Sequence, residues 1–182
     1  TWDEQATLQI EPADTQSIQH WPNGALKSRV GCFGHGKVDQ GTLLLMKTIE
    51  QELPNILSKF SLTQDRSSQE ESSVLRILDL GCGSGILSFF LEKLLPAPIR
   101  VEIIARDAHS LAIESLCMNG SEKTKILPSW GYLADNIPRD ASGKEKSFDI
   151  VISNPPFHLS KKTLNHLGEL WLDSLREIME PQ

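Results

Sequence analysis

A chain of 182 residues with a formal net charge of -6 can bury one core, and it is too acidic to bind nucleic acid through phosphate contacts alone. It contains no apolar run near the ~20 residues that cross a bilayer, so we expect no membrane span. The three cysteines, Cys32, Cys82 and Cys117, have neither a zinc-like nor a Cys-x-x-Cys spacing. We therefore expect no metal site and a reducing, cytoplasmic compartment. The opening stretch has no signal-peptide pattern. Because the chain begins at Thr1 and not at an initiator Met, we also expect it to be part of something longer.

Residues 1–30 form a lead-in segment with little periodicity. Within it, Asn23 and Gly24 tolerate positive φ and favour a tight turn, which suggests part of a hairpin. Thr42 is suited to cap a following helix through its hydroxyl, and Pro54 is expected to break or restart that helix. The polar stretch 61–73 predicts a flexible loop, because it cannot bury enough apolar surface to offset chain ordering.

From residue 74 onward, short apolar runs alternate with helical stretches. The predicted strands cover 74–80, 101–105, 125–127 and 148–153, and the predicted helices cover 86–95, 110–118 and 163–179. A polar, glycine-containing loop is expected at 139–147. Alternation of strand and helix implies an α/β fold with a parallel, doubly wound sheet, in one domain over residues 31–182.

A glycine-rich turn joins the first of these strands to its helix. Asp79 is followed by Gly81, Gly83 and Gly85, at the point where an α/β sheet lets a ligand approach the backbone. The dinucleotide fingerprint has its third glycine one position later, where this chain has Ile86. The alternative is a glycine-rich turn that binds no ligand.

Asp107 comes just after the predicted strand 101–105. An acid at this position of an α/β sheet can accept hydrogen bonds from both ribose hydroxyls of a nucleoside cofactor. The alternative is a cap or turn residue for the helix that follows.

The most selective motif is Asn154-Pro155-Pro156-Phe157-His158, directly after an apolar strand. An amino nitrogen conjugated to a ring is a poor nucleophile and must be aligned, and the Asn154 side-chain carbonyl and Pro155 backbone carbonyl could accept its two N–H bonds. Phe157 could stack on a target base, or it could be a core aromatic at a strand end. His158 could donate to a base or phosphate, or be structural. Such chemistry requires neither a metal nor a nucleophilic cysteine.

With Gly31-Cys32-Phe33 and the run 38–42 added to these motifs, the chain resembles the bacterial ribosomal RNA guanine-N2 methyltransferases, especially the small-subunit methyltransferase C group. The resemblance covers about 31–175 and implies a Rossmann-like class I methyltransferase sheet that uses S-adenosylmethionine (SAM) and has ribosomal RNA or a ribosomal subunit as substrate. It implies catalytic roles for Asn154, Pro155, Pro156 and Phe157, and substrate binding by Phe157 and His158. The cofactor-binding residues that it implies are Asp39, Gly41, Asp79, Gly81, Gly83, Gly85, Asp107, Ala108, Ser129 and Trp130.

The chain departs from this family in three respects, one of which is a longer loop at 61–73. Relatives often have Asp or Asn where this chain has Ser129-Trp130, at the position that contacts the adenine amino group. The sequence also stops after the fourth strand and its helix, so we expect a truncated sheet whose apolar edge is covered by a missing domain or another chain. Three alternatives to guanine-N2 methylation stay open: methylation of adenine N6, methylation of a protein glutamine, and a noncatalytic module that binds cofactor or RNA.

Overall fold

A computed structural model of the chain describes residues 16–21, 24–33, 35–64, 74–97, 99–121, 124–133, 135, 137, 148–155 and 161–179. Four parallel strands form its central sheet in the order β5-β4-β3-β6. Their bounds are Val74–Leu80 for β3, Arg100–Asp107 for β4, Lys125–Trp130 for β5 and Ile150–Ser153 for β6. The predicted parallel α/β sheet is confirmed, and β4 and β5 are longer than the sequence pattern indicated.

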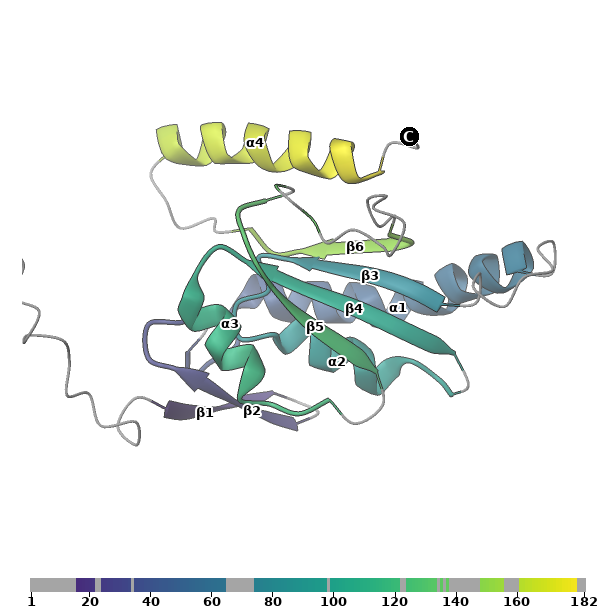
Figure 1. Ribbon diagram of the computed structural model, residues 1–182, viewed down its shortest axis with the longest axis horizontal. Helices are drawn as coiled ribbons and strands as arrows, with labels where there is room; N and C mark the ends of the chain where they lie inside the picture. The colour runs from purple at the N-terminus through teal and green to yellow at the C-terminus, as the bar shows by residue number, and fades with distance from the viewer. Residues whose placement is uncertain are drawn as a thin grey trace, which may run out of the picture.

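Helices lie on both faces of this sheet, as the doubly wound arrangement requires (Figure 1). The helices are α1 (Gln40–Gln64), α2 (Ile86–Leu94), α3 (Ser110–Cys117) and α4 (Lys161–Met179). Side chains of α1, α2 and α3 pack with Ile77 of β3 and Ile103 of β4 in one apolar cluster. Trp171 and Leu175 of α4 pack with Leu78 and Leu80 on the opposite face. The carboxyl ends of β3, β4 and β6 therefore open between two helical layers.

An antiparallel hairpin precedes the sheet. Its strands are β1 (Gln16–Trp21) and β2 (Gly24–Arg29), and Trp21 pairs with Gly24 across a two-residue connection. The expected hairpin is therefore confirmed in its strands. Asn119 joins β2 to the end of α3, because its side chain accepts from the Lys27 backbone N–H and donates to the Lys27 carbonyl, both at 2.9 Å. Through this contact, β2 packs directly on the α/β domain.

Helix α1 differs from the sequence prediction in three ways. It begins after Asp39, which caps it, and Thr42 is its third residue. It continues through Pro54, where a break was expected, because buried Leu53 and half-buried Leu57 hold the turns on either side in the core. It also extends to Gln64, so residues 61–64 of the expected loop 61–73 are helical. Residues 65–73 lie outside the described part of the chain, as does nearly all of the loop expected at 139–147.

Candidate cofactor and amine site

A cavity of about 320 Å³ opens at the carboxyl ends of the parallel strands. Its volume is within the range of small-molecule sites, and an α/β sheet binds its ligands at this edge. The cavity is lined by Phe33, Leu80, Gly81, Gly83, Arg106, Asp107, Ala108, Gly131, Tyr132, Leu133, Asn154, Leu167 and Trp171. It therefore brings together Gly81, Gly83, Asp107, Ala108 and Asn154, which the sequence motifs had singled out separately.

The glycine-rich turn forms the floor of this cavity. Gly81, Gly83 and Gly85 all have positive φ, between 54° and 82°, a conformation that other residues rarely adopt. The backbone N–H groups of Gly81 and Cys82 donate to the Arg106 carbonyl, at 2.8 and 3.0 Å, which ties the turn to the end of β4. Gly85 has a packing role instead, since a Cβ there would lie 2.2 Å from Leu116 of α3.

The carboxylate of Asp107 is held at the last position of β4. One oxygen accepts from the Gly83 N–H at 2.9 Å and the other from the His109 N–H at 2.8 Å. The cap of α3 is His109 rather than Asp107. Each carboxylate oxygen has further lone pairs, so Asp107 can still accept from the vicinal hydroxyls of a ribose in the cavity.

Asn154 is fixed by residues at the start of α1. Its amide nitrogen donates to the Thr42 hydroxyl at 2.9 Å and lies 3.3 Å from both carboxylate oxygens of Asp39. Thr42 in turn donates its hydroxyl proton to Asp39 at 2.5 Å. Because a carboxylate only accepts hydrogen bonds, it selects the amide nitrogen of Asn154 as its partner. The side-chain oxygen of Asn154 takes no part in these hydrogen bonds and is left as an acceptor.

Asp39 combines this role with capping of α1. Its carboxylate accepts from the Thr42 N–H at 3.1 Å, and its backbone carbonyl accepts from the Leu43 N–H. Partial burial acts to raise the pKa of Asp39, but hydrogen bonds from Thr42, Asn154 and the Gly41 backbone outweigh it and lower the pKa. Asp39 is therefore an anion at neutral pH, as the orientation of Asn154 requires.

Gly41 leaves room for this arrangement. A Cβ at Gly41 would lie 2.9 Å from the side-chain oxygen of Asn154 and 3.0 Å from a carboxylate oxygen of Asp39. Real Cβ atoms rarely come so close to an oxygen. Gly41 is thus required by the close approach of the two polar side chains.

Asp79 lies beneath the glycine-rich turn and is completely buried. Its carboxyl accepts a 2.7 Å hydrogen bond from the Ser88 hydroxyl of α2, and its other oxygen has no partner among the described residues. Burial raises the pKa of Asp79 to about 7, and the hydrogen bonds from Ser88 offset this only in part. Asp79 supports the turn from below and does not line the cavity.

The loop after β5 forms the opposite wall of the cavity and is organised by Arg106, which is 2% exposed. The guanidinium donates to the Leu133 carbonyl at 2.6 Å, to the Ser129 hydroxyl at 2.8 Å, and to the Asp135 carbonyl. Leu133 has a φ of 45°, which is uncommon for a residue with a side chain. A Cβ at Gly131 would collide with the guanidinium. One buried cation therefore holds a strained backbone in place.

Ser129 and Trp130 were expected at the adenine. Ser129 instead accepts from Arg106, and Trp130 is 73% exposed, with its indole N–H donating to the Ala108 carbonyl at 3.0 Å. Gly131, Tyr132 and Leu133 line the cavity there. These residues carry no motif, and only their position after a strand could have indicated them.

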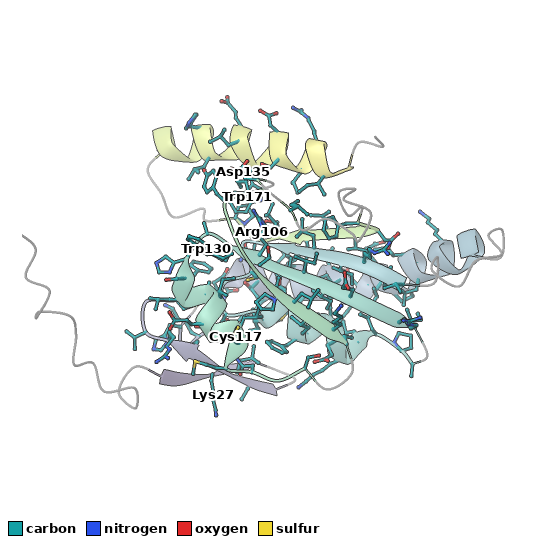
Figure 2. All side chains as sticks on the ribbon, in the orientation of Figure 1. Lys27, Arg106, Cys117, Trp130, Asp135 and Trp171 are labelled. Atoms are coloured by element: carbon teal, nitrogen blue, oxygen red, sulfur yellow. The ribbon has the colours of Figure 1, made fainter. Side chains whose placement is uncertain are left out.

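Trp171 of α4 forms a second wall of the cavity, and none of the sequence motifs indicated it. Figure 2 shows its side chain between α4 and the sheet, beside Arg106. Its indole N–H donates to the Ser153 hydroxyl at 2.8 Å, and Ser153 donates to the Leu80 carbonyl at 2.7 Å. A Cβ at Gly81 would lie 3.1 Å from two atoms of the indole ring. The positive φ and the close ring both require glycine at this position.

Pro155 is described and follows Asn154 at the end of β6, whereas Pro156, Phe157 and His158 lie outside the described residues. The roles expected of these three residues stay predictions. Within the described part of the chain, no group of three or more His, Cys, Asp or Glu side chains is arranged to hold a metal ion. No described helix combines the length and the apolar character needed to cross a bilayer.

The parallel sheet, the glycine-rich turn and the acid at the end of β4 define the cofactor-binding half of a class I methyltransferase fold. A family model described as the methyltransferase small domain matches residues 23–181. The chain therefore belongs to the methyltransferase small domain family.

Curated relatives agree with this assignment. The chain is 32% identical over 136 residues to ribosomal RNA small subunit methyltransferase C of Haemophilus influenzae strain PittEE, covering 75% of this chain and 32% of that protein. The protein of the same name from Serratia proteamaculans is 28% identical over 159 residues, covering 79% of this chain and 36% of the relative. The protein of the same name from Buchnera aphidicola subsp. Acyrthosiphon pisum is 30% identical over 139 residues, covering 76% of this chain and 32% of the relative. The chain thus spans about a third of the length of these relatives.

Proposed function

We propose that the protein transfers a methyl group from SAM to the exocyclic N2 amine of a guanine in ribosomal RNA. The observation that carries this proposal is the anchoring of Asn154 by Asp39 and Thr42 at the rim of the strand-end cavity. An amide oriented in this way presents a carbonyl oxygen to an amino group, and the cavity beside it accommodates a nucleoside-sized donor.

The residues present fit SAM. The backbone of Gly81 and Gly83 lets a ligand approach closely, and Asp107 offers carboxylate lone pairs to the ribose. Ala108, Tyr132 and Leu133 provide an apolar slot suited to the adenine. When bound, the donor supplies a methyl group already activated as a sulfonium, so alignment of the acceptor is the main task left to this chain.

The acceptor amine is aligned by carbonyl oxygens. The Asn154 side-chain oxygen accepts one N–H of the amine, and the Pro155 backbone carbonyl is the candidate for the second. The nitrogen lone pair then forms the new N–C bond while the C–S bond breaks, its electron pair stays on sulfur, and the nitrogen releases one proton to water. Alignment of this kind is worth about 7–11 kcal/mol in good intramolecular cases.

The choice of ribosomal RNA rests on the relatives, which are named as ribosomal RNA small subunit methyltransferases. Because the cavity is recessed, the guanine must be unpaired or flipped out of its stack. Phe157 and His158 are proposed to stack on and donate to this nucleotide. A net charge of -6 indicates that most phosphate contacts come from elsewhere in the assembly. Ribosomal RNA also implies a cytoplasmic location, which three free cysteines support.

The test is to incubate the protein with methyl-labelled SAM and ribosomal RNA or small ribosomal subunits, then to digest the products for mass spectrometry. Labelled N2-methylguanosine is the expected product. Labelled N6-methyladenosine or methylglutamine would instead support one of the two other amine acceptors. If calorimetric titration detects no SAM binding at all, this chain is not a methyltransferase on its own and the proposed function is wrong, which leaves the noncatalytic RNA-binding module among the alternatives.

We also propose that another segment or chain covers the outer edge of β6. Among the described strands, β6 pairs only with β3. An uncovered strand edge with half-buried Ile150 and Val151 favours further pairing. Hydrogen exchange of the β6 amides in the assembled protein should therefore be slow, and rapid exchange there would contradict this assignment.

A further inference from the structure

We propose that the indole ring of Trp171 is the surface against which the positively charged sulfonium of SAM packs, and that it makes the site prefer the charged donor over the neutral product S-adenosylhomocysteine. This inference rests on the proposed function. It adds a specificity-determining residue that none of the sequence motifs identified.

The chemistry of transfer restricts where the sulfonium can lie. The attacking nitrogen must approach the methyl carbon to about 3–3.5 Å, and that nitrogen is held by the oxygen of Asn154. The charged sulfur is bonded to the same methyl carbon. The positive charge therefore lies at the Asn154 end of the cavity, above the carboxyl ends of β3 and β6.

Trp171 is fixed at this end of the cavity by both strands. Its indole N–H binds the hydroxyl of Ser153, the residue immediately before Asn154. That hydroxyl binds the carbonyl of Leu80, the residue immediately before Gly81, and the indole ring packs closely against Gly81 itself. Both contacts are made by one edge of the indole, through its Nε1–H and through Cζ2 and Cη2, and they hold this edge at the two positions that flank the reacting atoms.

The acidic groups nearby are already engaged. Asp39 is held by Thr42 and Asn154, and Asp107 binds the Gly83 and His109 N–H groups. An aromatic face attracts a cation without the desolvation cost of a carboxylate, and tryptophan is the strongest such face. An alternative is that Trp171 is only an apolar wall, which would affect charged and neutral ligands equally.

The experiment measures dissociation constants for SAM and for S-adenosylhomocysteine by calorimetry in the full protein. We expect Trp171→Leu to weaken the binding of SAM by about tenfold and that of S-adenosylhomocysteine by less than about threefold, since only SAM carries a positive charge on sulfur. Trp171→Phe, which keeps an aromatic face and loses the Ser153 hydrogen bond, should retain most of the preference. Ser153→Ala is the matched control for loss of that hydrogen bond alone.

Fluorinated tryptophans test the same point without changing the shape of the site. Incorporation of mono-, di- and trifluorotryptophan withdraws charge from the ring face in steps, and SAM affinity should fall stepwise while S-adenosylhomocysteine affinity stays constant. Because the chain has four tryptophans, the same series in the Trp171→Phe protein is the control and should show no trend. Equal loss for the two ligands, or no trend in the wild-type series, would overturn the role of Trp171 while leaving the proposed function intact. Absence of SAM binding by the wild-type protein would overturn both.

Discussion

The side-chain nitrogen of Asn154 lies 3.3 Å from both carboxylate oxygens of Asp39, a residue 115 positions earlier in the chain. This contact joins the end of β6 to the start of α1 across the mouth of the cavity. It gives Asp39 two tasks, capping the helix and selecting the orientation of Asn154. Substitutions at this contact and around it can separate the two tasks.

Asp39→Asn should lower the rate of methyl transfer while leaving α1 intact. Asparagine caps helices as well as aspartate does, so we expect the free energy of unfolding to change by less than about 1 kcal/mol. A neutral amide cannot select the nitrogen of Asn154 as a carboxylate does, and we expect about a tenfold loss of kcat with little change in SAM affinity. Single-turnover kinetics and urea unfolding give the two values. An unchanged kcat would show that the carboxylate does not orient Asn154.

Gly41→Ala should separate stability from activity in the same way but for a steric reason. The new methyl group would lie 2.9 Å from the Asn154 oxygen and displace it. Alanine is favoured over glycine in helices by up to about 1 kcal/mol. This preference offsets the steric strain, so the free energy of unfolding should fall by well under about 1 kcal/mol. We expect kcat to drop at least about tenfold, because a small misplacement of an orienting group is costly. Gly168→Ala in α4 is the control, since a Cβ there meets no atom within 4 Å.

Arg106→Met should weaken SAM binding by loosening the loop that forms the adenine side of the cavity. The substitution leaves the carbonyls of Leu133 and Asp135 without their buried donor, which should cost about 2–4 kcal/mol of folding free energy. Calorimetry should show a SAM dissociation constant raised about tenfold, while the weaker substitution Ser129→Ala, which removes one of the three contacts, should change it less. If Arg106→Met binds SAM as tightly as the wild-type protein, the loop does not depend on Arg106.

Asp79 should make the protein less stable as pH rises from about 4 to above 7. Its pKa is about 7 when folded and near the ordinary value when unfolded, so in this window the folded state holds a proton that the unfolded state has released. Stability from this group is therefore fully present below about pH 4 and is lost, by on the order of 4 kcal/mol in total, as pH rises through 7. Asp79→Asn keeps an acceptor for Ser88 and cannot ionise, so its unfolding free energy should be flatter over the same range. A difference between the wild-type and Asp79→Asn unfolding free energies that stays constant through this window would contradict the assignment.

Much of the fold followed from local patterns. The apolar run 74–80 and the glycines after it predicted β3 and the turn correctly, because a buried parallel strand and a turn with positive φ each restrict residue type strongly. The start of α1 was less certain. Asp39 and Thr42 are both good capping residues, and only the register of the helix decides that Asp39 is the cap and Thr42 its third residue.

The less predictable parts of the site depend on contacts between distant segments. Trp171 has the spacing of an ordinary core residue on α4, and its approach to Gly81 follows from how the helix packs on the sheet. Arg106 lies within an otherwise apolar strand. Its charge alone did not indicate that it binds residues 23–29 positions later in the chain. The continuation of α1 through Pro54 likewise depends on core packing that outweighs the loss of one helical hydrogen bond.

Methyl transfer by Asn154→Ala, with SAM affinity measured in parallel, tests the role of Asn154 in catalysis. Asn154 is proposed to act on the acceptor amine and not to hold the donor, so kcat for labelling of ribosomal RNA should fall at least about a hundredfold while the SAM dissociation constant stays within about threefold. Near-normal methyl transfer by this variant, at unchanged SAM affinity, would show that Asn154 does not orient the amine.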